Sequence, residues 1–151
     1  MKLPNSRIAA FVNKPDPAVR VILVYGPDAG LVSERAAHLA KLAVPDLNDP
    51  FRVTVLAAAD LADDSARLHD EMASMSLGGG RRLVRIQSPG EAIAPVIGAL
   101  LADMPASDSL LLVEAGDLDK RSKLRAVCES ENPLICAIPC YVEDAAARQR
   151  T

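Results

Sequence analysis

The sequence predicts an α/β fold, an open and mostly parallel five-stranded sheet with helices on both faces. Short runs rich in apolar and β-branched residues alternate with longer segments in which apolar residues recur at helical spacing. Several of the runs are apolar at every position, which is typical of strands covered on both sides of a parallel sheet. With 151 residues, 50% of them hydrophobic, the chain also has the size and the apolar content of one domain.

The first strand and the first helix are expected on the two sides of a turn. Residues 21–25 form an apolar run that ends at Gly26-Pro27-Asp28, a strong turn signal. Residues 32–43 then carry apolar side chains at helical spacing, and Pro45 ends the pattern. A strand followed by a helix is the first half of the crossover that joins parallel strands.

The same alternation repeats in the middle of the chain. Residues 51–56 predict a second strand, and residues 61–75 predict a helix that Asp60 caps. One stripe of this helix is expected to face the sheet, and its members are Leu61, Ser65, Leu68, Met72 and Met75.

Three further strands complete the predicted sheet. They are expected at residues 82–86, 110–113 and 135–138. Between them, a helix is predicted over 93–101 with Pro95 in its first turn, and a short helix after Ser122, a favourable N-cap residue.

Composition excludes several classes of protein. The net charge of −3, with two Phe, two Tyr and no Trp, argues against DNA binding by this chain alone. The basic clusters 81–85 and 120–125 are expected on solvated faces, the second more suited to a partner. No apolar run has the roughly 18 residues of a transmembrane helix. Three cysteines, and first residues without a secretory apolar core, predict a cytoplasmic location.

The loop after the first strand lies where an open α/β sheet would hold a nucleotide phosphate. Only three residues separate Gly26 from Gly30, and no Lys follows Gly30. A phosphate-binding loop needs four intervening residues and that lysine, which neutralises the phosphate oxygens. Asp28 would add a repelling charge, so we interpret residues 26–30 as a structural turn that does not bind ATP.

An enzyme is the alternative function. Glu114 and Asp117 follow the fourth strand, where a hydrolase would place carboxylates for Mg²⁺ and water. Together with Asp28 they would make a small nucleotide or phosphate-ester hydrolase. Without the lysine of a phosphate loop, a solvated strand end is the favoured interpretation. His38 and His69 lack partners at metal-ligand spacing, so no metal site and no catalytic triad is predicted.

The segment from Met75 to Gly80 has two interpretations. It places Met75 and Leu77 immediately before three glycines. These side chains could form a small apolar plug for the groove of a partner. Alternatively, they could fold back as the C-terminal contact of the preceding helix.

Four motifs in order suggest a family. They are residues 24–32, residues 75–77 ahead of 81–85, residues 116–118 with 121–125, and residues 138–141. Together they resemble the N-terminal domain of the delta subunit of the bacterial DNA polymerase III clamp loader, in its alphaproteobacterial form. The resemblance covers essentially the whole chain.

The resemblance implies a degenerate AAA+ domain over residues 1–141 that neither binds nor hydrolyses ATP. Residues 142–151 would begin a helix leading to a further domain, so we expect the chain to be part of a longer subunit. The resemblance is to a non-catalytic subunit of a DNA-directed DNA polymerase complex, so no intrinsic catalysis and no cofactor are expected. The implied partners are the β sliding clamp and the gamma/tau and delta prime subunits, with DNA only as part of the full complex.

The resemblance also implies where the clamp is bound during replication. In the family, an apolar pair at the tip of this domain enters a hydrophobic pocket on the clamp and helps to open the ring. The family pattern Ser-Leu-Phe falls on Ser76, Leu77 and Gly78, so the leucine is kept and the aromatic residue is absent. The predicted clamp-binding residues are therefore Met75, Ser76, Leu77 and Gly78.

Overall fold

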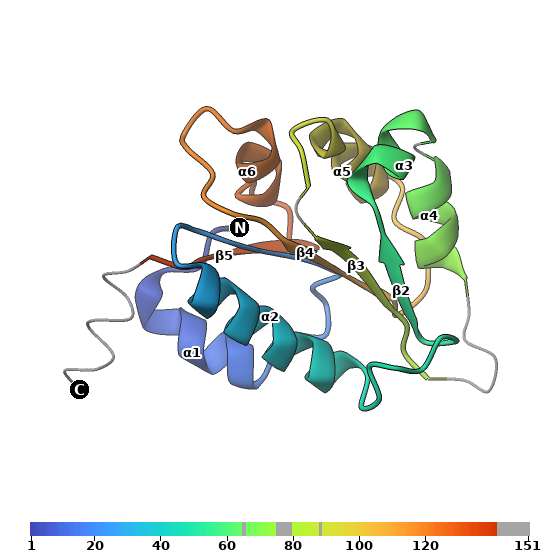
Figure 1. Ribbon diagram of the computed structural model, residues 1–151, viewed down its shortest axis with the longest axis horizontal. Helices are drawn as coiled ribbons and strands as arrows, with labels where there is room; N and C mark the ends of the chain where they lie inside the picture. The colour runs from blue at the N-terminus through green and yellow to red at the C-terminus, as the bar shows by residue number, and fades with distance from the viewer. Residues whose placement is uncertain (65, 75–79, 88, 142–151) are drawn as a thin grey trace.

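The computed structural model describes residues 1–64, 66–74, 80–87 and 89–141. Its centre is a five-stranded parallel sheet in the order β2-β3-β4-β1-β5 (Figure 1). The strands are β1 (Val21–Tyr25), β2 (Val53–Leu56), β3 (Leu83–Gln87), β4 (Leu110–Glu114) and β5 (Ile135–Pro139). The predicted fold class and the position of each predicted strand are confirmed.

Helices cover both faces of the sheet, as expected. One face carries α1 (Asn5–Asn13) and α2 (Ala29–Ala43) (Figure 1). The opposite face carries α3 (Ala58–Asp63), α4 (Ala66–Ala73), α5 (Ile93–Ala102) and α6 (Lys123–Cys128) (Figure 1). None of the helices described is long and apolar enough to cross a membrane.

Two apolar cores result from the period-two alternation of the strands. Leu23 and Val113 point into the core beneath α3 to α6, whereas Ile22 and Leu112 point toward α1 and α2. Every residue of β1 is buried, because helices cover it on both sides. This burial explains why the run over 21–25 has no polar position.

The strand order creates a switch point between β1 and β4. These strands are neighbours, with Ile22 opposite Leu112. The helix after β1 covers one face, whereas the helix after β4 covers the other (Figure 1). The connections 26–28 and 115–122 therefore leave the carboxyl edge of the sheet in opposite directions. In open α/β sheets this is the position where ligands bind.

The predicted helix over 61–75 is wrong as a single element. The chain forms α3 and α4 instead, and Asp64, the C-cap residue of α3, has a non-helical backbone conformation. Asp side chains compete for backbone hydrogen bonds and favour helix ends, which accounts for the end of α3 at Asp63 and Asp64. Asp60 lies inside the first turn of α3, and the N-cap is Ala57.

One strand begins later than expected, and one helix was not expected at all. Strand β2 begins at Val53 and not at residue 51, because the Asp49 carbonyl accepts hydrogen bonds from Arg52 and Val53 and keeps this stretch in a turn. Helix α1 was not predicted, since only Ile8 and Val12 of its nine residues are buried. The segment before it adds to the edge of β5, with Lys2 beside Ala137.

Candidate functional site

The loop after β1 is closed by contacts to other strand ends. Gly26 donates to the Gly116 carbonyl at 3.1 Å, and Asp28 donates to the Cys140 carbonyl at 3.2 Å. Gly26 has a φ of +146°, and a Cβ built on it would lie 2.1 Å from the Cys140 carbonyl oxygen. A glycine is therefore required here by the approach of the chain after β5, with no phosphate involved.

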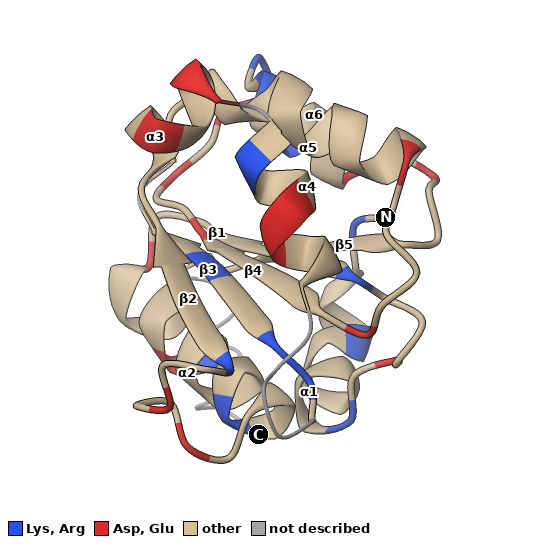
Figure 2. Ribbon diagram, turned by 90° about the vertical axis from the view of Figure 1, so that its right-hand side faces the viewer, with Lys and Arg blue, Asp and Glu red and all other residues tan. Residues whose placement is uncertain are grey.

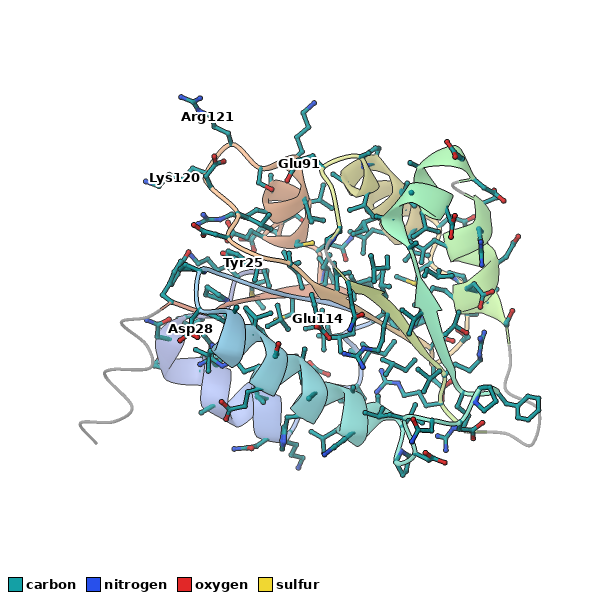
Figure 3. All side chains as sticks on the ribbon, in the orientation of Figure 1. Tyr25, Asp28, Glu91, Glu114, Lys120 and Arg121 are labelled. Atoms are coloured by element: carbon teal, nitrogen blue, oxygen red, sulfur yellow. The ribbon has the colours of Figure 1, made fainter. Side chains whose placement is uncertain are left out.

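The Asp28 side chain occupies the start of α2. Its Oδ1 accepts a hydrogen bond from the Leu31 backbone N–H at 3.0 Å. A carboxylate in this position satisfies a donor and complements the positive end of the helix dipole, both of which a phosphate would otherwise use. Figure 3 shows Asp28 at this end of the sheet, below the last residue of β1, Tyr25. The geometry supports the interpretation of Gly26, Asp28 and Gly30 as a degenerate loop, and the absence of ATP binding stays a prediction.

The three acidic residues of the hydrolase alternative have separate environments. Glu114 forms an ion pair with Arg85, and both side chains are largely buried. In Figure 3 Glu114 lies under the sheet, well along it from Asp28. Asp117 is exposed and lines an open hollow of about 590 Å³. Among the residues described, no group of three or more His, Cys, Asp or Glu side chains could hold a metal ion.

That hollow is framed by the connections before α5 and α6. Its charged lining residues have both signs: Glu91, Asp117, Asp119, Arg121 and Lys123. The Glu91 carboxylate already accepts hydrogen bonds from the Ser122 hydroxyl and from the backbone N–H groups of Lys123 and Leu124. With three acidic and two basic residues, the lining has no cluster of positive charge that would select a phosphate.

Among the described residues, histidines and cysteines contribute no reactive group to the carboxyl edge of the sheet. His69 contacts the exposed Asp103 at 3.5 Å, and His38 is exposed on α2. The three cysteines are buried. Burial raises the pKa of Cys128 to about 12 and that of Cys136 to about 11, so both remain protonated thiols at neutral pH.

In the second basic cluster, only Arg125 is an internal brace, whereas Lys120, Arg121 and Lys123 are exposed. Arg125 donates to Glu129 and to the Leu118 carbonyl, both at 3.1 Å, and its guanidinium lies 5.4 Å from the centre of the Tyr25 ring. Burial, followed by hydrogen bonds with Glu129 and Tyr141, raises the pKa of Tyr25. Lys120 and Arg121 project away from the body (Figure 3), and with the exposed Lys123 they are the basic residues of the second cluster that a partner could reach.

The predicted clamp-binding residues Met75, Ser76, Leu77 and Gly78 lie outside the described residues. The helix that precedes them, α4, is described. Arg82, which is buried, donates to the Glu71 carbonyl at 2.9 Å and to the Thr54 hydroxyl at 2.6 Å. The Ser107 hydroxyl donates to the Met72 carbonyl at 2.6 Å. The last turn of α4 is thereby fixed to the sheet.

Several residues that hold the loops and helices around the sheet could not be predicted from the sequence. Neither Glu91, which caps α6, nor the bracing roles of Arg82 and Arg125 were predicted. The N-cap role of Ser122 was predicted and is confirmed, since its hydroxyl accepts from the Arg125 N–H at 3.1 Å. A capping residue leaves a local signal in the sequence, whereas a brace between distant segments leaves none.

Comparison with known proteins finds solved structures with a similar fold. No protein-family model and no curated protein sequence matches this chain. A solved structure of the Bacillus subtilis DNA clamp loader delta protein is similar, with a TM-score of 0.63 and 18% identity over 91% of this chain and 42% of the other. A DNA polymerase III gamma subunit-related protein of Thermotoga maritima gives a TM-score of 0.57 and 11% identity over 91% of this chain and 46% of the other. The chain thus has the fold of a clamp-loader domain and spans less than half the length of these chains.

Proposed function

We propose that this chain is the N-terminal domain of a clamp-loader delta subunit, of the alphaproteobacterial type, that binds the β sliding clamp and helps to open it. The observation that carries the proposal is the likeness to the B. subtilis clamp loader delta protein over 91% of the chain. The similar fold of the gamma subunit-related protein, with a TM-score of 0.57, adds support. Met75, Ser76, Leu77 and Gly78 are the proposed clamp-binding residues.

A non-catalytic role within the polymerase complex is supported by the carboxyl edge. A nucleotide-hydrolysing site in this position would need free amide donors, a lysine and acidic groups for Mg²⁺. Here Asp28 occupies the start of α2, and Glu114 is paired with Arg85. The same observations weigh against the hydrolase alternative, because two of its three carboxylates, Asp28 and Glu114, are used in these contacts.

The proposed partners are the β sliding clamp and the gamma/tau and delta prime subunits, with DNA bound only by the full complex. The proposed location is the cytoplasm, where this complex would work. Residues 142–151 would lead into a further domain of the same subunit.

The proposal is tested by titrating the chain with the β sliding clamp of the same organism, using isothermal titration calorimetry. Saturable binding is expected, and its absence would contradict the proposed function. The hydrolase alternative is tested separately by the melting temperature of the chain with and without ATP and Mg²⁺. An unchanged melting temperature is expected, whereas a rise that saturates with nucleotide would favour the enzyme.

A further inference from the structure

An open groove lies between α1 and the edge strand β5. In Figure 1 and Figure 2, α1 is on the β5 side of the sheet, away from the opposite edge strand β2. The groove has a volume of about 540 Å³, and its lining includes the buried Val19 and Ile135 and the half-buried Phe11 of α1. Within the domain, α1 buries only Ile8 and Val12. The groove therefore adds an apolar surface to a helix that has little burial of its own.

The rim of this α1 groove is basic on the side of the helix. Arg7 and Lys14 line the groove, and both are exposed. Their side chains form no ion pair and no hydrogen bond with the residues that the structure describes. Asp16 also lines the groove, but its Oδ1 accepts a hydrogen bond from the Ala18 N–H at 2.9 Å. Two basic side chains beside an apolar surface favour a partner that is apolar and acidic.

The backbone at the edge of β5 is already used. The Ala137 N–H donates to the Met1 carbonyl at 2.9 Å, and the Leu3 N–H donates to the Ala137 carbonyl at 3.0 Å. Lys2, between them, forms a β-bridge with Ala137. A partner cannot add a strand at this point, because the hydrogen-bonding groups that strand addition needs are taken. A partner in the α1 groove must therefore bind through its side chains, as an amphipathic helix does in an apolar groove.

The spacing of the lining residues along α1 sets the pattern of such a helix. Arg7 and Lys14 are seven positions apart, which is about 10 Å along a helix axis. Phe11 lies between them in the chain. A partner helix that runs along α1 meets both basic residues with two acidic residues seven positions apart. Its apolar residues at the third or fourth position between those two then lie beside Phe11.

We propose that the α1 groove is a docking site for an acidic amphipathic helix of a partner protein, with carboxylates on Arg7 and Lys14 and an apolar side chain on Phe11. This inference goes beyond the proposed function, because the groove contains neither the proposed clamp-binding residues nor the carboxyl edge of the sheet. A nucleic acid matches the charge of the rim, but its phosphate backbone leaves the apolar surface uncovered. The combination of charge and apolar area therefore favours a protein helix.

The first test uses the full chain and a synthetic helical peptide that carries two Glu seven positions apart, with Leu residues between them. A matched peptide has Gln in place of both Glu. Fluorescence anisotropy of the labelled peptides measures the two affinities. The Glu peptide should bind about fivefold or more tightly at low salt, and the difference should shrink at high salt. Equal affinities, or no saturable binding of the Glu peptide, would overturn the proposal.

Charge reversal in the chain locates the contact. Arg7→Glu and Lys14→Glu should each weaken binding of the Glu peptide about threefold or more, with an unchanged melting temperature because both side chains are exposed. Lys41→Glu makes the same change in net charge at an exposed position of α2 outside the groove, and it should bind like wild type. The double variant Arg7→Glu/Lys14→Glu should prefer a third peptide with Lys in place of both Glu. Equal losses in all three single variants, or a double variant without this preference, would show that the groove is not the docking site.

Tryptophan fluorescence reports on the groove directly, because the chain contains no Trp. In Phe11→Trp the emission should shift to shorter wavelength when the Glu peptide, which also has no Trp, is added. Phe51→Trp, at an exposed position outside the groove, should show no shift. A duplex DNA oligonucleotide should leave the spectrum of Phe11→Trp unchanged. A shift with DNA and none with the peptide would assign the groove to nucleic acid, and an unshifted spectrum at saturating peptide would equally contradict the docking of a helix.

Discussion

Glu91 and Ser122 join the two connections at the carboxyl edge of the sheet, the Ser122 hydroxyl donating to Glu91 Oε2 at 2.8 Å. The other carboxylate oxygen accepts from the backbone N–H groups of Lys123 at 2.7 Å and of Leu124 at 3.1 Å. Glu91 precedes α5, whereas the donors begin α6. One carboxylate therefore satisfies the first turn of a helix that begins 32 residues further along the chain.

Glu91→Gln should lower the free energy of unfolding by about 1 kcal/mol at neutral pH, since a charged cap becomes neutral. Burial acts to raise the pKa of Glu91, but the hydrogen bonds from Leu124, Ser122 and Lys123 outweigh it and lower the pKa below 4.5. The stabilisation by a carboxylate whose pKa is lowered on folding is present above the ordinary value and is lost as the pH falls through the folded-state pKa.

The measurement is urea denaturation of wild type and Glu91→Gln at neutral pH and at about pH 3, where the difference should shrink. Glu34→Gln, an exposed change on α2, serves as the control and should match wild type at both values. A difference that is the same at both values would show that the charge of Glu91 is not what stabilises α6.

Gly26→Ala should destabilise the domain by about 3 kcal/mol or more, because the backbone has a positive φ and the new Cβ overlaps the Cys140 carbonyl. Gly98→Ala is the matched control. Gly98 lies in α5 with no atom within 4 Å of a built Cβ, so alanine should stabilise the helix by up to about 1 kcal/mol. Thermal denaturation measures both. Equal stability of Gly26→Ala and wild type would mean that the β1 loop can move away from the end of β5.

The strands could be predicted from the sequence because their signal is local. A run such as residues 21–25 is apolar throughout, and burial on both faces requires that pattern. Helix α1 could not, since it buries only Ile8 and Val12. The break between α3 and α4 was also missed, because the apolar stripe continues across it at Leu61 and Leu68.

The electrostatic contacts could not be predicted because they depend on strand order and register. Arg85 lies opposite Leu112, so Glu114 is its diagonal neighbour on the next strand. No local pattern pairs these two residues, which lie 29 positions apart. The basic cluster 81–85 was expected on a solvated face, because no local pattern shows the partners of its residues. In the structure, Arg82 and Arg85 point inward to partners on other elements.

Arg82→Ala should lower the free energy of unfolding by about 2–4 kcal/mol. The change leaves the Glu71 carbonyl and the Thr54 hydroxyl without their donor and removes the ion pair with Glu71. Arg121→Ala, an exposed control on the carboxyl edge, should change stability by less than about 0.5 kcal/mol. Chemical denaturation of the three forms gives both values. A loss no larger than that of the control would show that α4 is held without Arg82.

The final prediction concerns the proposed clamp contact itself. Leu77→Ala should weaken clamp binding by about 1.5–3 kcal/mol, or roughly ten- to a hundredfold, if the leucine is buried in an apolar pocket of the clamp. Gly78→Phe should strengthen binding, because it restores the aromatic residue of the family pattern, provided that the backbone there does not need a positive φ.

Clamp affinity and melting temperature are measured together for wild type, Leu77→Ala and Gly78→Phe. If Leu77 contacts the clamp, Leu77→Ala should lower the affinity for the clamp and leave the melting temperature unchanged. If Leu77 is instead packed inside the domain, Leu77→Ala should lower the melting temperature and leave the affinity unchanged, because the leucine then stabilises the fold and does not touch the clamp. If Leu77→Ala lowers the melting temperature and binds the clamp like wild type, Leu77 belongs to the core and the clamp-binding role of residues 75–78 is wrong.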